Sequence, residues 1–244
     1  MAPVTLLSTK GLSRRFGGLK AVNDVDFSIR EGEIRALIGP NGAGKTTFVS
    51  LLSGRISPSG GSIEFLGKDI TGRPAHKRVR DGIAYTFQIT SIYPMLSVFD
   101  NVALSAQSTL QRKSGSSSAA IAKKAIAALD RVGLTDRLGD KAGTMSYGHQ
   151  RLLEVAMGLA LEPKLLILDE PTQGLSDGEI DNFCRLVKGI ARSATVLLIE
   201  HNMPVVMQLA DTITVLNYGE ILAEGPPADI RANSAVQAAY LGTG

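Results

Sequence analysis

The chain has 244 residues, which is enough for one large domain or for a domain with a smaller one inserted into it. Hydrophobic residues make up 44% of the chain and charged residues 20%, a balance that excludes an intrinsically disordered protein, and the net charge is +3. The single cysteine, Cys184, excludes an internal disulfide, and its apolar neighbours at helical spacing predict a buried thiol.

The chain has no apolar stretch that approaches the roughly 20 residues needed to span a bilayer. Its first residues have neither the basic nor the apolar segment of a signal peptide. We therefore expect a cytoplasmic chain that reaches a membrane only through a partner. Most basic residues are scattered, apart from a cluster for which we weigh an anion-binding patch and favour a solvated helix face. The cluster consists of Arg73, Lys77, Arg78 and Arg80.

The N-terminal part predicts β-structure. Residues 24–29 alternate polar and apolar side chains, as in a strand with one buried face. An earlier strand over residues 12–16 ends at Gly17, and the alternation returns in residues 62–65. These strands predict an antiparallel sheet beside the core of the domain.

Residues 33–53 predict a strand, a glycine-rich loop and a helix. The loop at residues 39–46, GPNGAGKT, has the spacing G-x-x-x-x-G-K-[ST], and we call it the phosphate loop. Its glycines let backbone N–H groups turn inwards, and the helix start adds partial positive charge. Lys45 supplies a point charge for the terminal phosphates, and the Thr46 hydroxyl can ligate Mg²⁺. A glycine-rich turn that binds nothing is the alternative, and it would require all these features to coincide.

The predicted phosphate-binding residues are those of the loop and the residue after it. They are Gly39, Pro40, Asn41, Gly42, Ala43, Gly44, Lys45, Thr46 and Thr47.

The middle of the chain predicts mainly helices. We expect a helix over residues 74–80 and then a strand over residues 83–87, with Gln88 directly after it. A helix should follow from an N-cap at Ser97 to about residue 107. Residues 113–118 predict a mobile low-complexity loop, and residues 119–131 predict a further helix. Because residues 89–151 carry helices without clear strands, we expect them to form a helical insertion. The flanking residues 1–88 and 152–244 would then form one α/β core.

The last third of the chain returns to α/β patterning. Residues 165–168 and 196–199 are continuous apolar runs, typical of strands buried on both faces. A capping box at Ser176 and Glu179 begins the helix between them. Residues 212–223 predict a hairpin, and two short helices are expected to finish the chain.

Polar residues follow the predicted parallel strands at the points where each strand ends. Such strand ends meet at one edge of a sheet, where ligands bind. Asp169 and Gln88 have the oxygen atoms that Mg²⁺ prefers, Glu170 can orient or deprotonate a water, and His201 can hydrogen-bond a γ-phosphate. Singly, each has a structural explanation as a cap, an ion-pair partner or a buried polar residue. Together with the phosphate loop, they predict a site of nucleotide hydrolysis.

The order of these motifs resembles that of the ATP-binding subunits of ABC transporters, over essentially the whole chain. Phe16 matches the aromatic residue that stacks on adenine, residues 39–46 match the Walker A loop, and Gln88 matches the Q-loop. Residues 145–149 (MSYGH) match the signature, and residues 165–170 match Walker B. Residues 174–177 match the D-loop, and His201 matches the switch histidine. The resemblance implies a P-loop NTPase core with an antiparallel β subdomain and an inserted helical subdomain. It implies ATP and Mg²⁺ as ligands, ATP hydrolysis as the activity, and Lys45, Gln88, Glu170 and His201 as catalytic residues.

The signature departs from the usual LSGGQ of the family at two positions. Tyr147 replaces a glycine, as in amino-acid importer subunits, and His149 replaces the final glutamine. Ser146 and Gly148 are kept, and the resemblance implies that they offer a hydroxyl and a backbone N–H to a γ-phosphate at the start of a helix over residues 150–161. We expect phosphate binding to survive. For His149 we weigh a weakened or retuned contact to the partner's ribose or phosphate and favour a tolerated substitution.

The resemblance also implies partners. A second ATPase subunit, identical or different, would pack head-to-tail so that each signature faces the other chain's phosphate loop. Two transmembrane permease subunits, and indirectly a solute-binding protein, would complete a transporter at the cytoplasmic face of the membrane. Residues 89–98 would line the groove for a permease helix, with ordinary core packing as the equally weighted alternative. No nucleic-acid partner is expected.

A finer resemblance points to importers of branched-chain or hydrophobic amino acids. It rests on residues 86–88 (TFQ), the SYG core of the signature, residues 197–203 (LLIEHNM) and residues 239–242 (AYLG). Urea or amide importers, and exporters of lipid or lipopolysaccharide, share parts of this pattern. The remaining alternatives are a soluble ABC ATPase that acts on nucleic acid or ribosomes, and a nucleotide-binding module without useful turnover.

Overall fold

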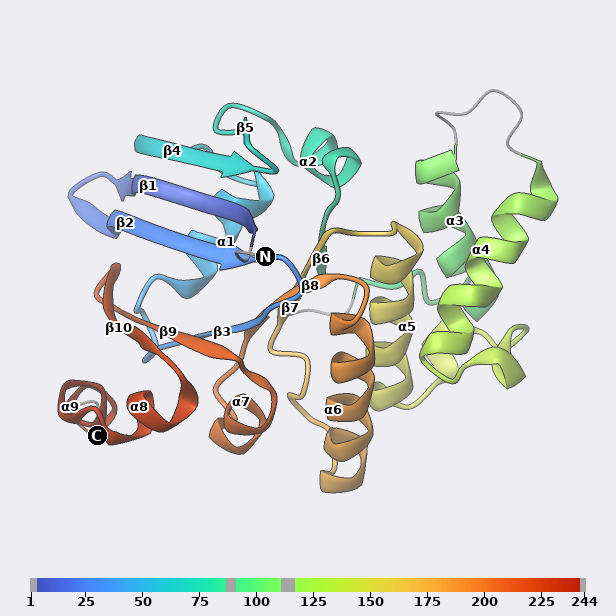
Figure 1. Cartoon of the computed structure of the whole chain (residues 1–244). Coiled ribbons are helices and arrows are strands. Elements are labelled where there is room, and N and C mark those ends of the chain that lie inside the picture. The colour runs from blue at the N-terminus through green and yellow to red at the C-terminus, as the bar shows by residue number, and fades with distance from the viewer. Residues whose placement is uncertain (1–3, 87–90, 111–116, 242–244) are drawn as a thin grey trace.

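Two β-sheets organise the computed structural model, which describes residues 4–86, 91–110 and 117–241. The first sheet is antiparallel, has the strand order β2-β1-β4-β5 and lies at the upper left of Figure 1. Its strands are β1 (Thr5–Phe16), β2 (Leu19–Arg30), β4 (Gly60–Phe65) and β5 (Lys68–Asp69). The predicted antiparallel sheet is confirmed, and both N-terminal strands are longer than the sequence pattern indicates.

The second sheet has six strands in the order β10-β9-β3-β8-β7-β6. Its strands are β3 (Ile34–Ile38), β6 (Ile83–Thr86), β7 (Leu165–Asp169), β8 (Thr195–Ile199), β9 (Thr212–Asn217) and β10 (Glu220–Gly225). All pairs are parallel except the β9–β10 hairpin. Every residue of β3, β7 and β8 is buried, as expected for strands covered on both faces.

The residues of the parallel strands alternate between two cores, because successive side chains point to opposite faces of a sheet. Leu165 and Ile167 face the first sheet and helix α1 (Lys45–Ser53), which lies between the two sheets in Figure 1. Leu166 and Leu168 face the helices on the other side. The phosphate loop therefore leads into a helix that is enclosed by both sheets.

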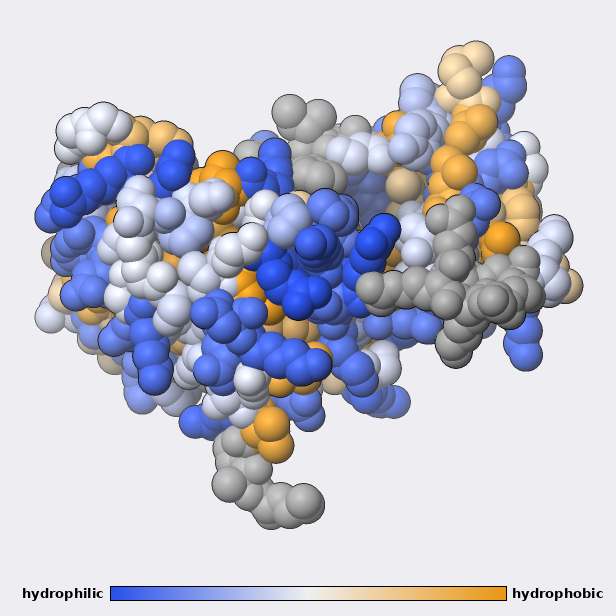
Figure 2. All heavy atoms as spheres, turned by 90° about the horizontal axis from the view of Figure 1, so that it is seen from above, coloured by the Kyte–Doolittle hydropathy of each residue, from blue (hydrophilic) through white to orange (hydrophobic). Residues whose placement is uncertain are grey.

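Helices α3 (Val98–Leu110), α4 (Ser118–Arg131) and α5 (Tyr147–Ala160) pack together, and α3 and α4 form the right-hand side of Figure 1. The Ser97 hydroxyl accepts from the Asp100 N–H at 3.0 Å and begins α3, as predicted. Figure 2 shows hydrophobic residues on the surface over this side, and Leu104 and Ile126 are exposed there. The division of the chain at residues 89–151 stays a prediction, and its second boundary lies inside α5.

The remaining helices cover the lower face of the parallel sheet or its edges. They are α2 (Ala75–Asp81), α6 (Asp177–Ala191), α7 (Met203–Leu209), α8 (Pro227–Ala232) and α9 (Ser234–Leu241). Cys184 is fully buried on α6, as predicted. Within the described residues, no helix is both long enough and apolar enough to cross a membrane.

Several predictions fall wholly or partly on residues outside the described ranges, among them the end of the predicted strand at 83–87 and the start of the predicted groove at 89–98. Gln88 lies there, and so does most of the predicted mobile loop at residues 113–118. The end of that predicted loop is instead the start of α4, because Ser117 is the N-cap of the helix and its side chain accepts from the Ala120 N–H.

The prediction of a solvated face for the basic cluster is wrong for one of its residues. Arg78 is 1% exposed, and its guanidinium donates to the carbonyl oxygens of Leu51 and Leu52 at 2.7 and 2.9 Å and to those of Thr71 and Arg73. It thus closes the C-terminal end of α1, where a positive charge is favourable. Burial lowers the pKa of Arg78 to about 10, so the side chain stays charged at neutral pH.

Candidate nucleotide-binding site

The phosphate loop is held tightly between β3 and α1 because glycines occupy its two closest approaches. A Cβ on Gly39 would collide with the carbonyl oxygen of Leu216, and a Cβ on Gly44 would collide with that of Ala21. Gly44 also has a φ of 97° as the N-cap of α1, a conformation that favours glycine. The loop therefore presents its backbone at the start of a helix, the arrangement that binds anions.

The Lys45 ammonium lies over its own loop. Its Nζ donates to the carbonyl oxygens of Gly39 at 2.5 Å and Pro40 at 3.0 Å. Partial burial lowers the pKa of Lys45, and the nearby carboxylates of Glu170 and Asp169 oppose that shift. The loop itself thus positions a cation where terminal phosphates would be bound.

A cavity of about 560 Å³ opens in front of the loop. Its lining residues are Leu19, Lys20, Ala21, Asn41, Gly42, Ala43, Gly44, Lys45, Thr46, Thr47, Glu170 and Tyr218. The turn of the β9–β10 hairpin joins this wall, because the Gly219 N–H donates to the Ala43 carbonyl at 2.9 Å. The structure therefore brings residues 41–47 of the predicted phosphate-binding set and Glu170 to one cavity, whereas Gly39 and Pro40 do not line it.

Phe16 does not line this cavity, although its cross-strand partner Leu19 does. The Phe16 ring is 46% exposed, and the Arg14 guanidinium carbon lies 4.6 Å from its centroid. Phe16 is thus at the edge of the cavity, on the tip of the β1–β2 hairpin. Tyr218 lines the cavity from the other hairpin, and the sequence analysis did not single it out.

Asp169 ends β7 as a buried carboxylate. The Tyr85 hydroxyl, from the neighbouring strand β6, donates to Asp169 Oδ2 at 2.6 Å. Burial raises the pKa of Asp169, whereas this hydrogen bond and the Lys45 charge act in the opposite direction. Burial and the Asp169 charge raise the pKa of Tyr85, which keeps the phenol protonated as a donor. Tyr85 therefore orients the predicted metal ligand.

Glu170 and His201 lie side by side at the ends of adjacent strands β7 and β8. Glu170 has a φ of 47°, which is uncommon for a residue with a side chain, and its N–H donates to the Ile199 carbonyl at 2.9 Å. The His201 Nδ1 atom is 3.8 Å from Glu170 Oε1. The Glu170 side chain is 20% exposed and that of His201 is 60% exposed. The strained backbone thus places a carboxylate in the cavity with an accessible imidazole beside it.

A buried carboxylate that the sequence analysis did not assign connects these strand ends. Glu200 accepts from the N–H and hydroxyl of Thr172 at 3.0 and 2.5 Å, and from the N–H groups of His201 and Asn202 at 3.0 and 3.1 Å. Four donors satisfy the charge of a side chain that is only 1% exposed. Its position directly after a buried strand was the available sequence signal.

The signature segment forms the start of α5, which begins at Tyr147 rather than at Gln150 as predicted. Ser146 is the N-cap, and its Oγ lies 2.7 Å from His149 Nδ1. A Cβ on Gly148 would collide with the Glu179 carboxylate. Neither Ser146 nor Gly148 lines the cavity at the phosphate loop. The structure therefore does not bring these two predicted ligands to the loop of the same chain.

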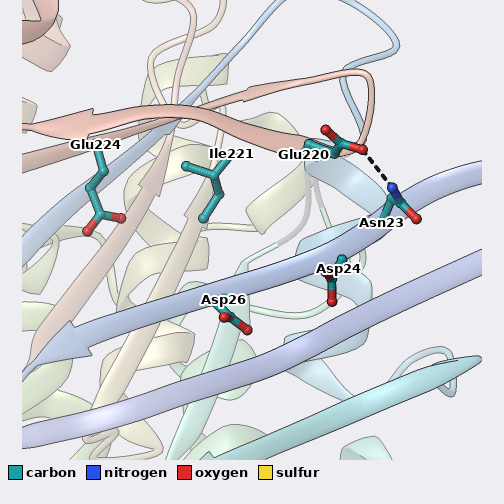
Figure 3. Close-up of a pocket in the computed structure, with 6 residues that line it drawn as sticks. All are labelled: Asn23, Asp24, Asp26, Glu220, Ile221 and Glu224. Atoms are coloured by element: carbon teal, nitrogen blue, oxygen red, sulfur yellow. Dashed lines mark hydrogen bonds between the residues drawn. The ribbon is translucent and has the colours of Figure 1, made fainter.

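A second pocket, of about 450 Å³, lies between β2 and β10 and is rich in carboxylates (Figure 3). Its side chains are used within the protein. Asn23 donates to Glu220 at 2.6 Å, the Gly11 N–H donates to Asp26 at 2.6 Å, and Glu224 pairs with Arg35 at 2.7 Å. Of these contacts, the hydrogen bond between Asn23 and Glu220 joins the two sheets.

Comparison with known proteins decides the family. A model of the family described as "ABC transporter" matches residues 22–173, and one described as "Branched-chain amino acid ATP-binding cassette transporter" matches residues 220–244. The chain is 39% identical to the high-affinity branched-chain amino acid transport ATP-binding protein BraF of Pseudomonas aeruginosa, over 97% of this chain and 98% of that protein. It is 38% identical to LivG of Escherichia coli, a protein of the same description, with the same coverage. The chain belongs to the ABC transporter family.

Solved ABC cassettes have the same fold. The structure matches a nucleotide-free ATP-binding cassette from an ABC transporter with a TM-score of 0.88 and 27% identity, over 97% of this chain and 99% of the other. It matches the ADP conformation of the cassette MJ1267 with a TM-score of 0.89 and 27% identity, over 98% and 99% of the two chains. The predicted fold class is confirmed, and nucleotide binding is a property of the family.

The donor atoms at the site of this ABC cassette fit a magnesium ion that arrives with a nucleotide. Asp169 and Thr46 offer oxygen atoms, which hard cations prefer. In the part of the chain that the structure describes, no group of three or more His, Cys, Asp or Glu side chains could hold a metal by itself. Magnesium is commonly held in this incomplete manner, by one or two protein oxygens together with the phosphates of the substrate.

Proposed function

We propose that this ABC cassette binds ATP with Mg²⁺ at the phosphate loop, hydrolyses it with Glu170, and thereby powers the import of branched-chain amino acids. The observation that carries the enzymatic part is that Glu170 lines the same cavity as the phosphate loop, with the His201 imidazole 3.8 Å away. The substrate class is supported by the names of the two full-length relatives and by the match of residues 220–244 to the branched-chain cassette model.

The loop residues hold the phosphates in this proposal. The N–H groups at the start of α1 and the Lys45 ammonium bind the β- and γ-phosphates. Thr46, Asp169 and Gln88 are the proposed ligands of Mg²⁺, which supplies charge neutralisation at the phosphates. Phe16, an exposed aromatic residue, is the proposed stacking partner of the adenine ring.

Glu170 is the proposed base. Its carboxylate accepts a hydrogen bond from the attacking water and takes up a proton as the new bond to phosphorus forms. His201 donates a hydrogen bond to the γ-phosphate from the neighbouring strand end. Gln88 is proposed to help position the water. Tyr85 and Glu200 hold Asp169 and the His201 backbone in place, respectively.

A second ATPase chain completes the proposed site. Ser146 and Gly148 begin α5 away from the cavity of their own chain, and the exposure of Ser146 supports a contact between this helix start and a phosphate bound by another chain. Two chains packed head-to-tail would each contribute to both sites, by two-fold symmetry if they are identical. ATP would hold the pair together, and hydrolysis would release it.

The proposed permease contact is the segment before α3. Tyr93, Met95 and Leu96 are exposed hydrophobic side chains, and Met95 is 75% exposed. Exposed apolar clusters of this kind are typical of protein interaction sites. Two permease subunits, together with a solute-binding protein on the other side, would make this cassette a peripheral protein at the cytoplasmic face of the membrane.

The enzymatic proposal is tested with Glu170→Gln, which removes the base and keeps the shape of the side chain. We expect ATP binding to be retained, multiple turnover to fall by about 10²- to 10⁴-fold, and an ATP-bound dimer to accumulate. Steady-state ATPase assays and analytical ultracentrifugation measure these effects. Glu31→Gln, an exposed carboxylate remote from the cavity, is the matched control. Hydrolysis by Glu170→Gln at the parent rate would refute the assignment.

The transport proposal is tested with the membrane and solute-binding proteins that co-purify with the cassette. Reconstituted into vesicles with ATP, they are expected to take up radiolabelled leucine, isoleucine and valine. Uptake of urea in preference to these amino acids, or ATP-dependent movement of lipid, would refute the substrate class and leave the ATPase assignment intact.

A further inference from the structure

The contact between Ser146 and His149 contains a titratable group that the usual glutamine of the signature would not supply. Ser146 Oγ lies 2.7 Å from His149 Nδ1, and the backbone N–H of His149 points to the same oxygen at 3.4 Å. A histidine changes its charge between about pH 5 and pH 8, whereas glutamine does not titrate. The signature of this chain therefore has two protonation states.

The two states differ in what the serine hydroxyl can do. A hydroxyl has one proton to donate and two lone pairs that accept. When Nδ1 carries no proton, Ser146 donates its only proton to the ring. Its oxygen can then only accept hydrogen bonds from a ligand at the N-terminus of α5. When Nδ1 is protonated, Oγ accepts from the ring and from the backbone N–H, and the hydroxyl proton is free to point outwards.

Only the second arrangement can donate a hydrogen bond to a phosphate oxygen. A neutral imidazole carries its proton on either ring nitrogen, whereas the imidazolium always carries one on Nδ1. Protonation of His149 therefore removes the arrangement that withholds the hydroxyl proton. It also adds a positive charge at the start of α5, where the helix already favours an anion.

Two charged side chains lie beside His149. Glu179 on α6 and Arg151 on α5 line the same small cavity as His149. Hydrogen bonds from the Ser176 N–H and hydroxyl lower the pKa of Glu179, and the charge of His149 acts in the same direction. Arg151 is buried in an ion pair with Glu154 at 2.7 Å. Of these three side chains, His149 is the only imidazole.

We propose that His149 is a positioning residue whose protonation turns the Ser146 hydroxyl towards the γ-phosphate bound by a second chain, so that ATP-dependent pairing of two chains is favoured at lower pH. The inference rests on the head-to-tail site proposed above. In this proposal, the orientation of the Ser146 hydroxyl depends on pH. In a signature with glutamine, the orientation of the serine would not change with pH near neutrality.

The test uses the Glu170→Gln chain, in which hydrolysis does not deplete the dimer. The ATP concentration that gives half-maximal dimerisation is measured by sedimentation between about pH 6 and pH 8. We expect this concentration to rise on the order of tenfold with pH when His149 is present, the size of a typical coupling between two binding events. His76 and His201 remain in every variant, so differences report on position 149.

Two substitutions separate positioning from a merely structural role. His149→Asn keeps an amide donor near the place of Nδ1 without a titrating group, so its dimerisation should stay strong and change less than about twofold with pH. His149→Ala removes both the ring acceptor that withholds the hydroxyl proton and the titrating group, so its dimerisation should also change less than about twofold with pH. If His149→Asn retains the full pH dependence, or if pairing strengthens as the pH rises, the proposal is wrong. If no variant forms an ATP-dependent dimer at any pH, the proposed head-to-tail site fails as well.

A second measurement does not need the dimer. Nitrogen-15 NMR of the histidine rings reports which ring nitrogen of His149 carries the proton. Ser146→Ala is expected to shift the His149 Nδ1 signal, because it removes the oxygen 2.7 Å away. An unchanged Nδ1 signal and an unchanged titration would overturn the hydrogen bond on which the inference depends.

Discussion

The phosphate loop and the signature segment are held in place by different kinds of contact. Around the loop, the holding contacts join residues far apart in sequence: Tyr85 with Asp169, Arg78 with the end of α1, and Glu200 with Thr172. At the signature, the Ser146–His149 contact spans one turn at an exposed helix start. The first region is preorganised by the folded core, whereas the second is a local structure on the surface.

This difference explains why the phosphate loop and the signature would contribute to different steps, nucleotide binding by one chain and pairing of two chains. A preorganised loop can bind a nucleotide in a single chain, because its donors are already aimed and cost little to order. An exposed serine at a helix start gains a role only when another chain brings a phosphate to it. Substitutions around the loop should therefore act on stability and on single-chain binding, and those at the signature should act on pairing.

The largest effect should come from removing the anchor of the loop helix. Arg78→Leu removes the guanidinium partner of four carbonyl groups, two of them in buried and two in part-buried hydrogen bonds. We expect the free energy of unfolding to fall by about 3 kcal/mol or more. Urea denaturation measures this loss. Lys77→Leu, on the same helix but exposed, is the matched control and should change stability by less than about 0.5 kcal/mol. An equally small effect for Arg78→Leu would show that the core does not hold the loop helix through this residue.

The next prediction separates the two regions by function. Lys45→Ala removes the cation of the loop and should weaken ATP binding to the single chain by about 100-fold, as expected for a charge-assisted contact. Ser146→Ala should weaken ATP-dependent dimerisation by about tenfold, with single-chain affinity within about twofold of the parent. Fluorescent-nucleotide titration and sedimentation measure the two quantities. If Ser146→Ala weakened single-chain binding as much as Lys45→Ala, the division between the regions would be wrong.

The smallest effect concerns the helix start that lies beside the signature. Hydrogen bonds from Ser176 lower the pKa of Glu179, so its ionised form stabilises the folded chain above the ordinary glutamate pKa of about 4.3, and this stabilisation is lost as the pH falls through the lowered value. The stability difference between the parent and Glu179→Gln should therefore shrink as the pH drops from about 7 to below about 4. Urea denaturation across this range checks it, with Glu64→Gln as an exposed control. A difference that grows in acid would contradict the capping role of the carboxylate.

Much of the fold was predictable because its signals are local. The phosphate loop, the apolar runs that became β7 and β8, and the capping box at Ser176 each depend on neighbouring residues. Residues 41–47 and Glu170 share a cavity because the strand ends of a parallel sheet meet at one edge.

The rest of the site depends on contacts that no local pattern reveals. Arg78 has the sequence context of an exposed helix face, and only packing against α1 buries it. Tyr218 lines the cavity because its hairpin folds beside the loop. Tyr85 and Glu200 matter through partners 84 and 28 residues away. The start of α5 at Tyr147 was missed because Ser146, and not a residue near Gln150, is the N-cap.

The Glu200 carboxylate couples two segments, the one after β7 and the one after β8. Its hydrogen bonds tie the segment that follows Asp169 and Glu170 to the backbone of His201. A displacement of either loop must carry the other with it, or else leave a buried charge without donors, which is costly. If a second chain displaces the segment after Glu170, the backbone that carries the His201 imidazole is expected to move with it. In a pair of chains, two nucleotide sites would then be coupled directly through the hydrogen bonds of Glu200, without a series of side-chain rearrangements between them.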